Sequence, residues 1–272
     1  METTERPKNR KRLWLGLAAL PILLLALWLG GREGGVLGVA DHVGYAVCHQ
    51  ITVRTYVFGD LVMPLCARCS GQYLGVLIGF FLVWRWGRIR AMGFPPRWLV
   101  AVLVGFLAIW AFDGFNSYLL LILGRPFLYP PQNILRISTG ILQGLAVSFL
   151  FLPFFNSVFW AEPDPDRVLQ SGWELAQALG LGALVVAAVA SGWTVLFYPL
   201  AILSVAGTVL MLSLVGAIFV MLLLREENSN RTLGDFFSLL LPGMAFTALL
   251  LLGIDFFRAF AESSLGMVLP TG

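Results

Sequence analysis

All three cysteines of this chain lie between residues 48 and 69, and one of its only two histidines stands beside the first of them. Cys48 is followed directly by His49, and Cys66 and Cys69 form a CxxC pair. Thiolate sulfur and imidazole nitrogen are ligands that zinc favours in proteins. A zinc site made from Cys48, His49, Cys66 and Cys69 is therefore the first hypothesis for this segment.

Other uses of the same thiols stay open. A CxxC pair can form a redox-active or structural disulfide, which leaves one odd thiol because three cysteines cannot all pair within a chain. The cysteines can also be small packing residues without any ligand. His42 stands seven residues before His49, so the two histidines would share a face if one helix carried both.

The residues around the CxxC pair predict how it is presented. Pro64 suits the first turn of a helix. A helix that starts there places Cys66 and Cys69 on one face, near the positive end of the helix dipole. Arg68 lies between them. Since a helix N-terminus and a nearby cation both lower the pKa of a thiol, Arg68 is a candidate for thiol activation.

Composition indicates that these residues belong to a membrane protein. The 272 residues are 58% hydrophobic and 12% charged, whereas soluble domains carry about 25% charged residues. No basic stripe with interleaved aromatic residues points to nucleic-acid binding. Apolar runs near the roughly 20 residues needed to cross a bilayer predict an all-α polytopic integral membrane protein with about seven transmembrane helices. The predicted spans are Leu13–Gly30, Ser70–Trp86, Trp98–Leu121, Asn133–Phe155, Trp173–Gly192, Pro199–Leu224 and Phe236–Phe257.

The placement of basic residues predicts the orientation, because Lys and Arg concentrate in cytoplasmic loops. With the N-terminus in and the C-terminus out, 12 of the 18 Lys and Arg residues are cytoplasmic. The segment 31–69, with all the cysteines, then lies on the extracytoplasmic side of a multi-pass protein of the cell membrane. Thiols there tend to be oxidised or bound to metal. We expect this segment to form short helices at the membrane edge.

The chain divides into four predicted parts. They are a basic cytoplasmic tail (1–12), a four-helix membrane core (13–155) that includes the segment 31–69, a polar proline-rich cytoplasmic linker (156–172) and a three-helix extension (173–272).

Glycines at four-residue spacing predict one specific helix contact. The second span carries Gly71, Gly75 and Gly79, and the fourth carries Gly140 and Gly144. Small residues at this spacing let helix backbones approach closely in lipid. We therefore expect the second and fourth spans to pack together.

Polar residues gather near the outer ends of the third and fourth spans. They are Asp113, Asn116, Asn133, Arg136, Thr139 and Gln143. Charges at membrane depth line cavities or pair with one another. This predicts an ion pair between Asp113 and Arg136 in a polar pocket for an anionic small molecule or a lipid headgroup. The alternative is that both charges are interfacial and snorkel to water.

Four spaced blocks resemble the signature of an uncharacterised prokaryotic membrane-protein family with the label DUF2085. The blocks are CHQ at 48–50, PLCARC at 64–69, DG at 113–114 and NxxRxxTG at 133–140. The resemblance covers about residues 41–150 and implies a prokaryotic plasma-membrane protein. It implies no reaction. Motif positions by this resemblance are Cys48, His49, Gln50, Arg54, Cys66, Arg68, Cys69, Asp113, Asn133, Arg136 and Gly140.

Three functions follow from these observations as alternatives. The first is an extracytoplasmic Cys/His cluster that binds a thiophilic metal, zinc. The second is a thiol–disulfide oxidoreductase in which Cys48 is the shuttle or resolving thiol of the CxxC pair, although no second CxxC is present. The third is a transporter of a small solute or metal through Asp113 and Arg136, although no internal repeat is visible. Neither catalysis nor an oligomeric state follows from the sequence.

Overall fold

The computed structural model describes residues 35–125 and 127–265, together with residues 19, 22–23 and 26. The basic tail 1–12 lies outside these residues, and the first predicted span, Leu13–Gly30, lies almost entirely outside them.

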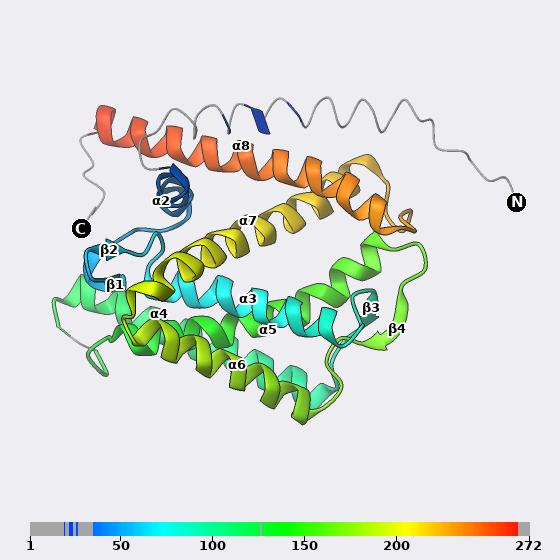
Figure 1. Cartoon of the computed structure of the whole chain (residues 1–272), viewed down its shortest axis with the longest axis horizontal. Coiled ribbons are helices and arrows are strands. Elements are labelled where there is room, and N and C mark those ends of the chain that lie inside the picture. The colour runs from blue at the N-terminus through cyan, green and yellow to red at the C-terminus, as the bar shows by residue number, and fades with distance from the viewer. Residues whose placement is uncertain (1–18, 20–21, 24–25, 27–34, 126, 266–272) are drawn as a thin grey trace, which may run out of the picture.

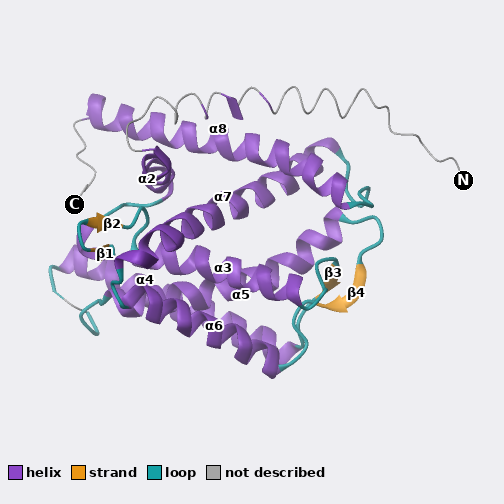
Figure 2. Ribbon diagram, in the orientation of Figure 1, coloured by secondary structure: helices purple, strands orange, loops and turns teal. Residues whose placement is uncertain are grey.

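Helices joined by loops make up the described chain, together with two small strand pairs (Figure 2). Its helices are α2 (Gly35–Val47), the short 3₁₀ helix η1 (Thr52–Arg54), α3 (Ala67–Arg85), α4 (Arg97–Leu123), α5 (Asn133–Phe159), α6 (Gly172–Ala190), α7 (Thr194–Leu224) and α8 (Leu233–Leu265). Its strands are β1 (Val57–Phe58), β2 (Leu61–Val62), β3 (Ala91–Gly93) and β4 (Asp164–Arg167). Six of these helices, α3 to α8, are long and apolar enough to cross a membrane. This confirms the prediction of an all-α polytopic membrane protein.

The long helices form a bundle whose two ends differ. Figure 1 shows α2, β1 and β2 at one end of the bundle and β3 and β4 at the other. The helix α3 begins at the first end, and α5, which packs along it, begins there as well. Two neighbouring helices therefore run in the same direction, with their N-termini at the end that carries the cysteines.

The contact between α3 and α5 is a contact between backbones, as the glycine spacing predicts. A Cβ atom built at Gly75 would lie 2.5 Å from the carbonyl oxygen of Ile141, and one at Gly144 would overlap the carbonyl oxygen of Gln72. Gly71 and Gly140 meet the facing backbone in the same way. The predicted packing of the second and fourth spans is confirmed.

The segment predicted as the linker 156–172 contributes to the structure at the other end of the bundle. Its strand β4 pairs in parallel with β3, with Ala91 opposite Asp164 and Gly93 opposite Arg167. Val168 and Leu169, which follow β4, are fully buried. The composition predicts a linker, and in the structure these two apolar residues and the strand pairing hold this linker against the ends of α3 and α5.

The segment between α2 and α3 contains a hairpin where only short helices were expected. The helix α2 is present, but β1 and β2 then pair as antiparallel strands around Gly59 and Asp60. Gly59 has a φ of +63°, a conformation that tight hairpin turns require and that glycine adopts without strain. A Gly-Asp pair between Val57-Phe58 and Leu61-Val62 is a hairpin signal that the apolar content of the segment obscured.

The last two helices cover the cysteine end of α3. The helix α7 packs along α3, and a Cβ at Gly207 would lie 2.8 Å from the carbonyl oxygen of Tyr73. Residues of α2, α7 and α8 share one apolar cluster with the cysteine segment. Its buried members are Ala40, Val43, Ala46, Cys48, Leu65, Val205 and Leu251.

Candidate functional site: a three-cysteine centre

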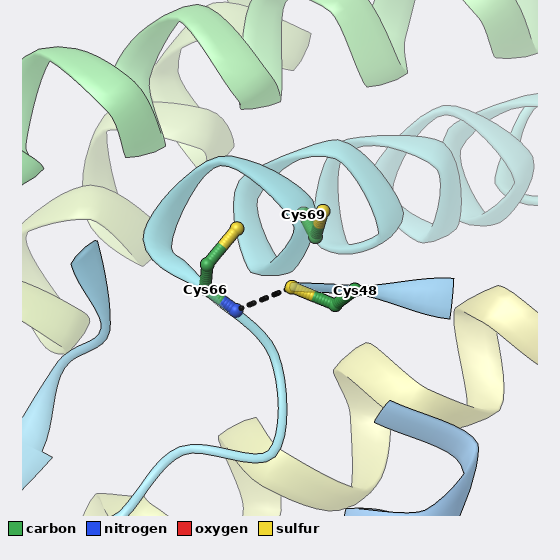
Figure 3. A group of neighbouring side chains, drawn as sticks. All are labelled: Cys48, Cys66 and Cys69. Atoms are coloured by element: carbon green, nitrogen blue, oxygen red, sulfur yellow. Dashed lines mark hydrogen bonds between the residues drawn. The ribbon is translucent and has the colours of Figure 1, made fainter. Parts of the chain in front are cut away.

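The three cysteine sulfurs form one group. The Sγ atoms of Cys48, Cys66 and Cys69 all lie within 4.8 Å of one another. Figure 3 shows Cys66 and Cys69 at the start of α3 and Cys48 reaching them from the segment after α2. The backbone N–H of Cys66 donates a hydrogen bond to Cys48 Sγ at 3.3 Å. All three are free thiols, and Cys48 is buried.

The first turn of α3 presents two of the sulfurs. The helix begins at Ala67 with Cys66 as its N-cap, three residues after the start at Pro64 that the sequence favoured. No side chain caps this helix terminus. The Ser70 hydroxyl instead donates to the carbonyl oxygen of Leu65 at 3.1 Å and so fixes the extended approach to the helix. The pair is therefore presented by a helix start, as expected, with one cysteine on the cap.

Gln50 fixes the position of the third sulfur. The chain leaves α2 at Val47, and Gln50 adopts a φ of +47°. Its side-chain amide donates to the carbonyl oxygens of Asp41 and Pro64, both at 3.0 Å. Gln50 thus bridges α2 to the segment that leads into α3. This places Cys48 beside Cys66.

Arg258 of α8 also holds the segment that carries Cys48. Its guanidinium donates to the carbonyl oxygens of Tyr45 and Cys48, the latter at 3.3 Å. It also lies 3.8 Å from the centre of the Tyr45 ring, an arrangement that stabilises a cation by its attraction to the aromatic face.

The histidines do not join the sulfur group. His49 follows Cys48 but is exposed, and the group of candidate metal ligands found in the described part of the chain contains the three cysteines alone. His42 lies on α2, whereas His49 lies beyond its end, so the two do not share a helix face. The four-ligand hypothesis is therefore reduced to three sulfurs in this structure. Cys48 is buried and His49, the next residue, is exposed, because adjacent side chains point in different directions.

The three thiols share protons unequally. Hydrogen bonds from the thiols of Cys66 and Cys69 lower the pKa of Cys48 well below its usual range, against burial, which raises it. The pKa of Cys66 is raised, chiefly because its thiol donates to the sulfur of Cys48. Cys48 is therefore the first thiolate of the group. It draws this character from its neighbouring thiols rather than from Arg68, the residue that the sequence singled out for thiol activation.

Arg68 forms an ion pair with Asp113 of α4. Its Nη2 donates to Asp113 Oδ2 and, at 3.2 Å, to the hydroxyl of Ser117. The hydroxyl of Tyr129 donates to the other carboxylate oxygen at 2.8 Å. The predicted ion pair between Asp113 and Arg136 is therefore wrong, because Arg68 reaches the carboxylate from the neighbouring helix start. The expectation that Asp113 is buried and paired rather than snorkelling is confirmed, since its side chain is 2% exposed.

The other predicted pocket residues lie on the same two helices, α4 and α5, and most of them have hydrogen-bond partners of their own. Asn116 accepts from the N–H of Leu128 and donates to the carbonyl oxygen of Tyr129. The Nη1 of Arg136 donates to Asn133 Oδ1 at 2.8 Å. Thr139 and Gln143 are buried, and Gln143 Oε1 has no hydrogen-bond partner in the described structure. The polar residues thus lie within the helix bundle, on the C-terminal half of α4 and the N-terminal half of α5.

Replacing Asp113 by Asn should destabilise the protein by about 3 kcal/mol, because removing one partner of a buried ion pair leaves an uncompensated charge. Arg68 keeps its charge in this variant but loses the carboxylate. The measurement is the thermal midpoint in detergent. Asp60→Asn is the matched control, since Asp60 is exposed in the hairpin turn. Equal midpoints for the two variants would contradict a stabilising role for the pair.

Three positioning residues were not predicted as such from the sequence. Gln50 stands in the CHQ block, so its place in a motif was visible but its bridging role was not. Tyr129 and Arg258 carry no local signal, because each acts on a residue outside its own helix or loop, and Arg258 on one 210 positions away. Only the folded arrangement identifies them.

Comparison with known proteins finds relatives over the part of the chain that contains the three cysteines. The profile of a family described as "Predicted membrane protein (DUF2085)" matches residues 48–150. An uncharacterized protein of Methanocaldococcus jannaschii is 31% identical over 114 residues, which cover 42% of this chain and 67% of that protein. An uncharacterized protein of Methanothermobacter thermautotrophicus is 31% identical over 107 residues, which cover 38% of this chain and 83% of that protein. No solved structure matches this chain.

Proposed function

Because this chain belongs to the DUF2085 family of predicted membrane proteins, and the matched segment contains all three cysteines, we propose that this multi-pass membrane protein binds a thiophilic metal ion, zinc, through Cys48, Cys66 and Cys69. The observation that carries the proposal is the convergence of three sulfurs from two separate segments to within 4.8 Å of one another.

The spacing of the sulfurs fits a single ion. A tetrahedral zinc ion with zinc–sulfur bonds of about 2.3 Å needs sulfurs about 3.8 Å apart, and the observed upper limit of 4.8 Å leaves only a small contraction. The N–H of Cys66 that points at Cys48 Sγ supports a thiolate at that position. The positive end of α3 supports negative charge on the sulfurs of its first turn.

Three protein ligands leave one coordination position for a ligand from outside the chain. Among the described residues no histidine or carboxylate joins the sulfurs. Zinc sites with four protein ligands are structural, whereas sites with three keep a position open for water or substrate. The proposed centre is therefore of the open kind. It lies on the extracytoplasmic side if the basic residues orient the chain as the positive-inside rule predicts.

The test is metal content and free-thiol count on one detergent-purified sample of the full chain, prepared without reductant. We expect about one zinc ion per chain and three thiols that react after a chelator removes the metal. No zinc together with one reactive thiol per chain would overturn the proposal, because a disulfide would then occupy the site.

A thiol–disulfide oxidoreductase is the second candidate function. The observation in its favour is the lowered pKa of Cys48 beside two further thiols, since a thiolate next to a second cysteine is the arrangement of redox-active pairs. The same sample decides between the two functions. The oxidoreductase would show a disulfide that is reduced and reformed reversibly without release of metal.

A further inference from the structure

Three arginines beside the cysteine centre carry more positive charge than the acidic residues near them neutralise. We propose that Arg54, Arg68 and Arg136 form a binding site for a phosphate group, either free phosphate or the phosphate of a lipid headgroup. This inference rests on the proposed function, because the phosphate site would lie next to Cys66 of the proposed metal centre. It goes further by naming the chemical class of the ligand.

Contacts across three elements bring these arginines together. The side-chain amide of Asn133 donates to the carbonyl oxygen of Val53 at 3.3 Å, which docks η1 and its last residue, Arg54, on the start of α5. The same Asn133 accepts from Arg136. Arg68 comes from the first turn of α3, where a Cβ at Gly140 would overlap its backbone oxygen. The charge of Arg136 interacts with those of both Arg54 and Arg68.

Of the three guanidinium groups, Arg68 alone is paired with a carboxylate. Among the described residues, Asp113 is the one acid that forms an ion pair with any of them. Three positive charges and one negative charge leave a surplus of two. Zinc held by three thiolates adds one negative charge nearby, so the surplus remains positive when the centre is loaded. An uncompensated charge at the edge of a membrane bundle is costly, and a bound anion removes that cost.

Donor groups for such an anion are present and unused. Arg136 is only 6% exposed, and its Nε has no hydrogen-bond partner in the described structure. The Nε of Arg68 is buried without a partner as well. Burial, and after it the positive charge of Arg68, lowers the pKa of Arg54, in keeping with an excess of positive charge at this place.

The shape and charge of the donors favour phosphate. Guanidinium groups bind phosphate through paired N–H donors. The N-termini of α3 and α5 lie side by side at this end of the bundle and add two helix dipoles with their positive ends toward the site. A phosphate presents several acceptor oxygens and can satisfy three arginines at once, whereas a carboxylate presents two.

The first experiment labels arginines of the full, zinc-loaded chain in detergent with phenylglyoxal and reads each site by mass spectrometry. Inorganic phosphate should slow the labelling of Arg54 at least about fivefold, while acetate at equal ionic strength should not. Arg125, exposed at the same end of the bundle, is the internal control. Protection of Arg54 in nanodiscs of phosphatidylglycerol, without protection by inorganic phosphate, would identify a lipid headgroup as the source.

The second experiment measures the affinity of the protecting phosphate compound for two variants. Arg54→Gln should weaken binding at least about tenfold, as expected for loss of a charged hydrogen bond, and Arg125→Gln should leave it within about twofold. Arg54 lies on a surface 3₁₀ helix, so this variant should fold. No protection by either phosphate source, equal protection by acetate, or equal loss in both variants would overturn the proposal.

Zinc content, measured on the same samples, separates this inference from the metal proposal. Arg54→Gln should keep the zinc of the wild-type chain. Phosphate protection in a chain that lacks zinc would reject the metal proposal alone, and zinc without protection would reject the phosphate site alone.

Discussion

Cys69→Ser should reduce zinc from about one ion per chain to a small fraction of that value, and Cys66→Ser should do the same. Each change removes one of the three proposed sulfur ligands, and a serine hydroxyl does not replace a thiolate on zinc. Loss of a residue that only hydrogen-bonds to a metal ligand weakens zinc affinity about 10- to 100-fold. Loss of a ligand itself should weaken zinc affinity by more than this. The measurement is zinc per chain after dialysis against a weak chelator, with the thermal midpoint recorded alongside.

His49→Ala is the matched control for these variants. His49 belongs to the same motif but is exposed and lies outside the sulfur group, so its removal should leave zinc content and affinity unchanged. If His49→Ala lost as much zinc as Cys69→Ser, the fourth position would be occupied by this histidine and the open site would be refuted. If Cys69→Ser kept its zinc, the three-sulfur centre itself would be refuted.

The second large effect concerns the helix contact beneath the site. Gly144→Ala should destabilise the protein by about 3 kcal/mol or more, because the added methyl group meets the carbonyl oxygen of Gln72 and the amide of Val76 rather than a movable side chain. The helices α3 and α5 must separate to admit it. The thermal midpoint in detergent and the yield of monodisperse protein both measure this.

Gly105→Ala in α4 tests whether the effect belongs to the contact or to glycine in general. A Cβ at Gly105 meets nothing within 4 Å, so alanine there should be neutral or stabilise the helix by up to about 1 kcal/mol. A similar loss of stability in both variants would contradict the close packing of α3 on α5. A loss at Gly144 alone would confirm it.

The sequence predicted the parts of the site that depend on one helix or on chain proximity. Glycine spacing identified the faces of α3 and α5 that meet, because small residues four apart always lie on one face. The cysteines could be assigned to one site from residue type and from their closeness in the chain. The partner of Asp113 was assigned wrongly, because spacing along a helix does not give its rotation relative to its neighbours. Arg68 and Arg136 both lie near Asp113, and only the packing decides which of them reaches it.

The hairpin and the second strand pair escaped prediction for a related reason. Two-residue strands such as β1 and β2 leave almost no periodic signal. The pairing of β3 with β4 joins segments about 70 residues apart in the chain, and local composition does not record it. The same is true of Gln50 and Arg258, which fix the cysteine segment through backbone carbonyl oxygens. Any residue type offers these oxygens, so they leave no trace in the sequence.

The contact of Arg258 with the backbone of Cys48 has a consequence for the biosynthesis of the centre. The two residues are 210 positions apart, and at about 5 to 20 residues per second the ribosome needs roughly 10 to 40 seconds to make the chain between them. During that interval the segment with Cys48 has already been made but lacks the residue that later holds its carbonyl oxygens. A nascent chain stopped before α8 would carry the same three thiols on a backbone without this support. Completion of the last helix is therefore the step that completes the support of the three-cysteine centre.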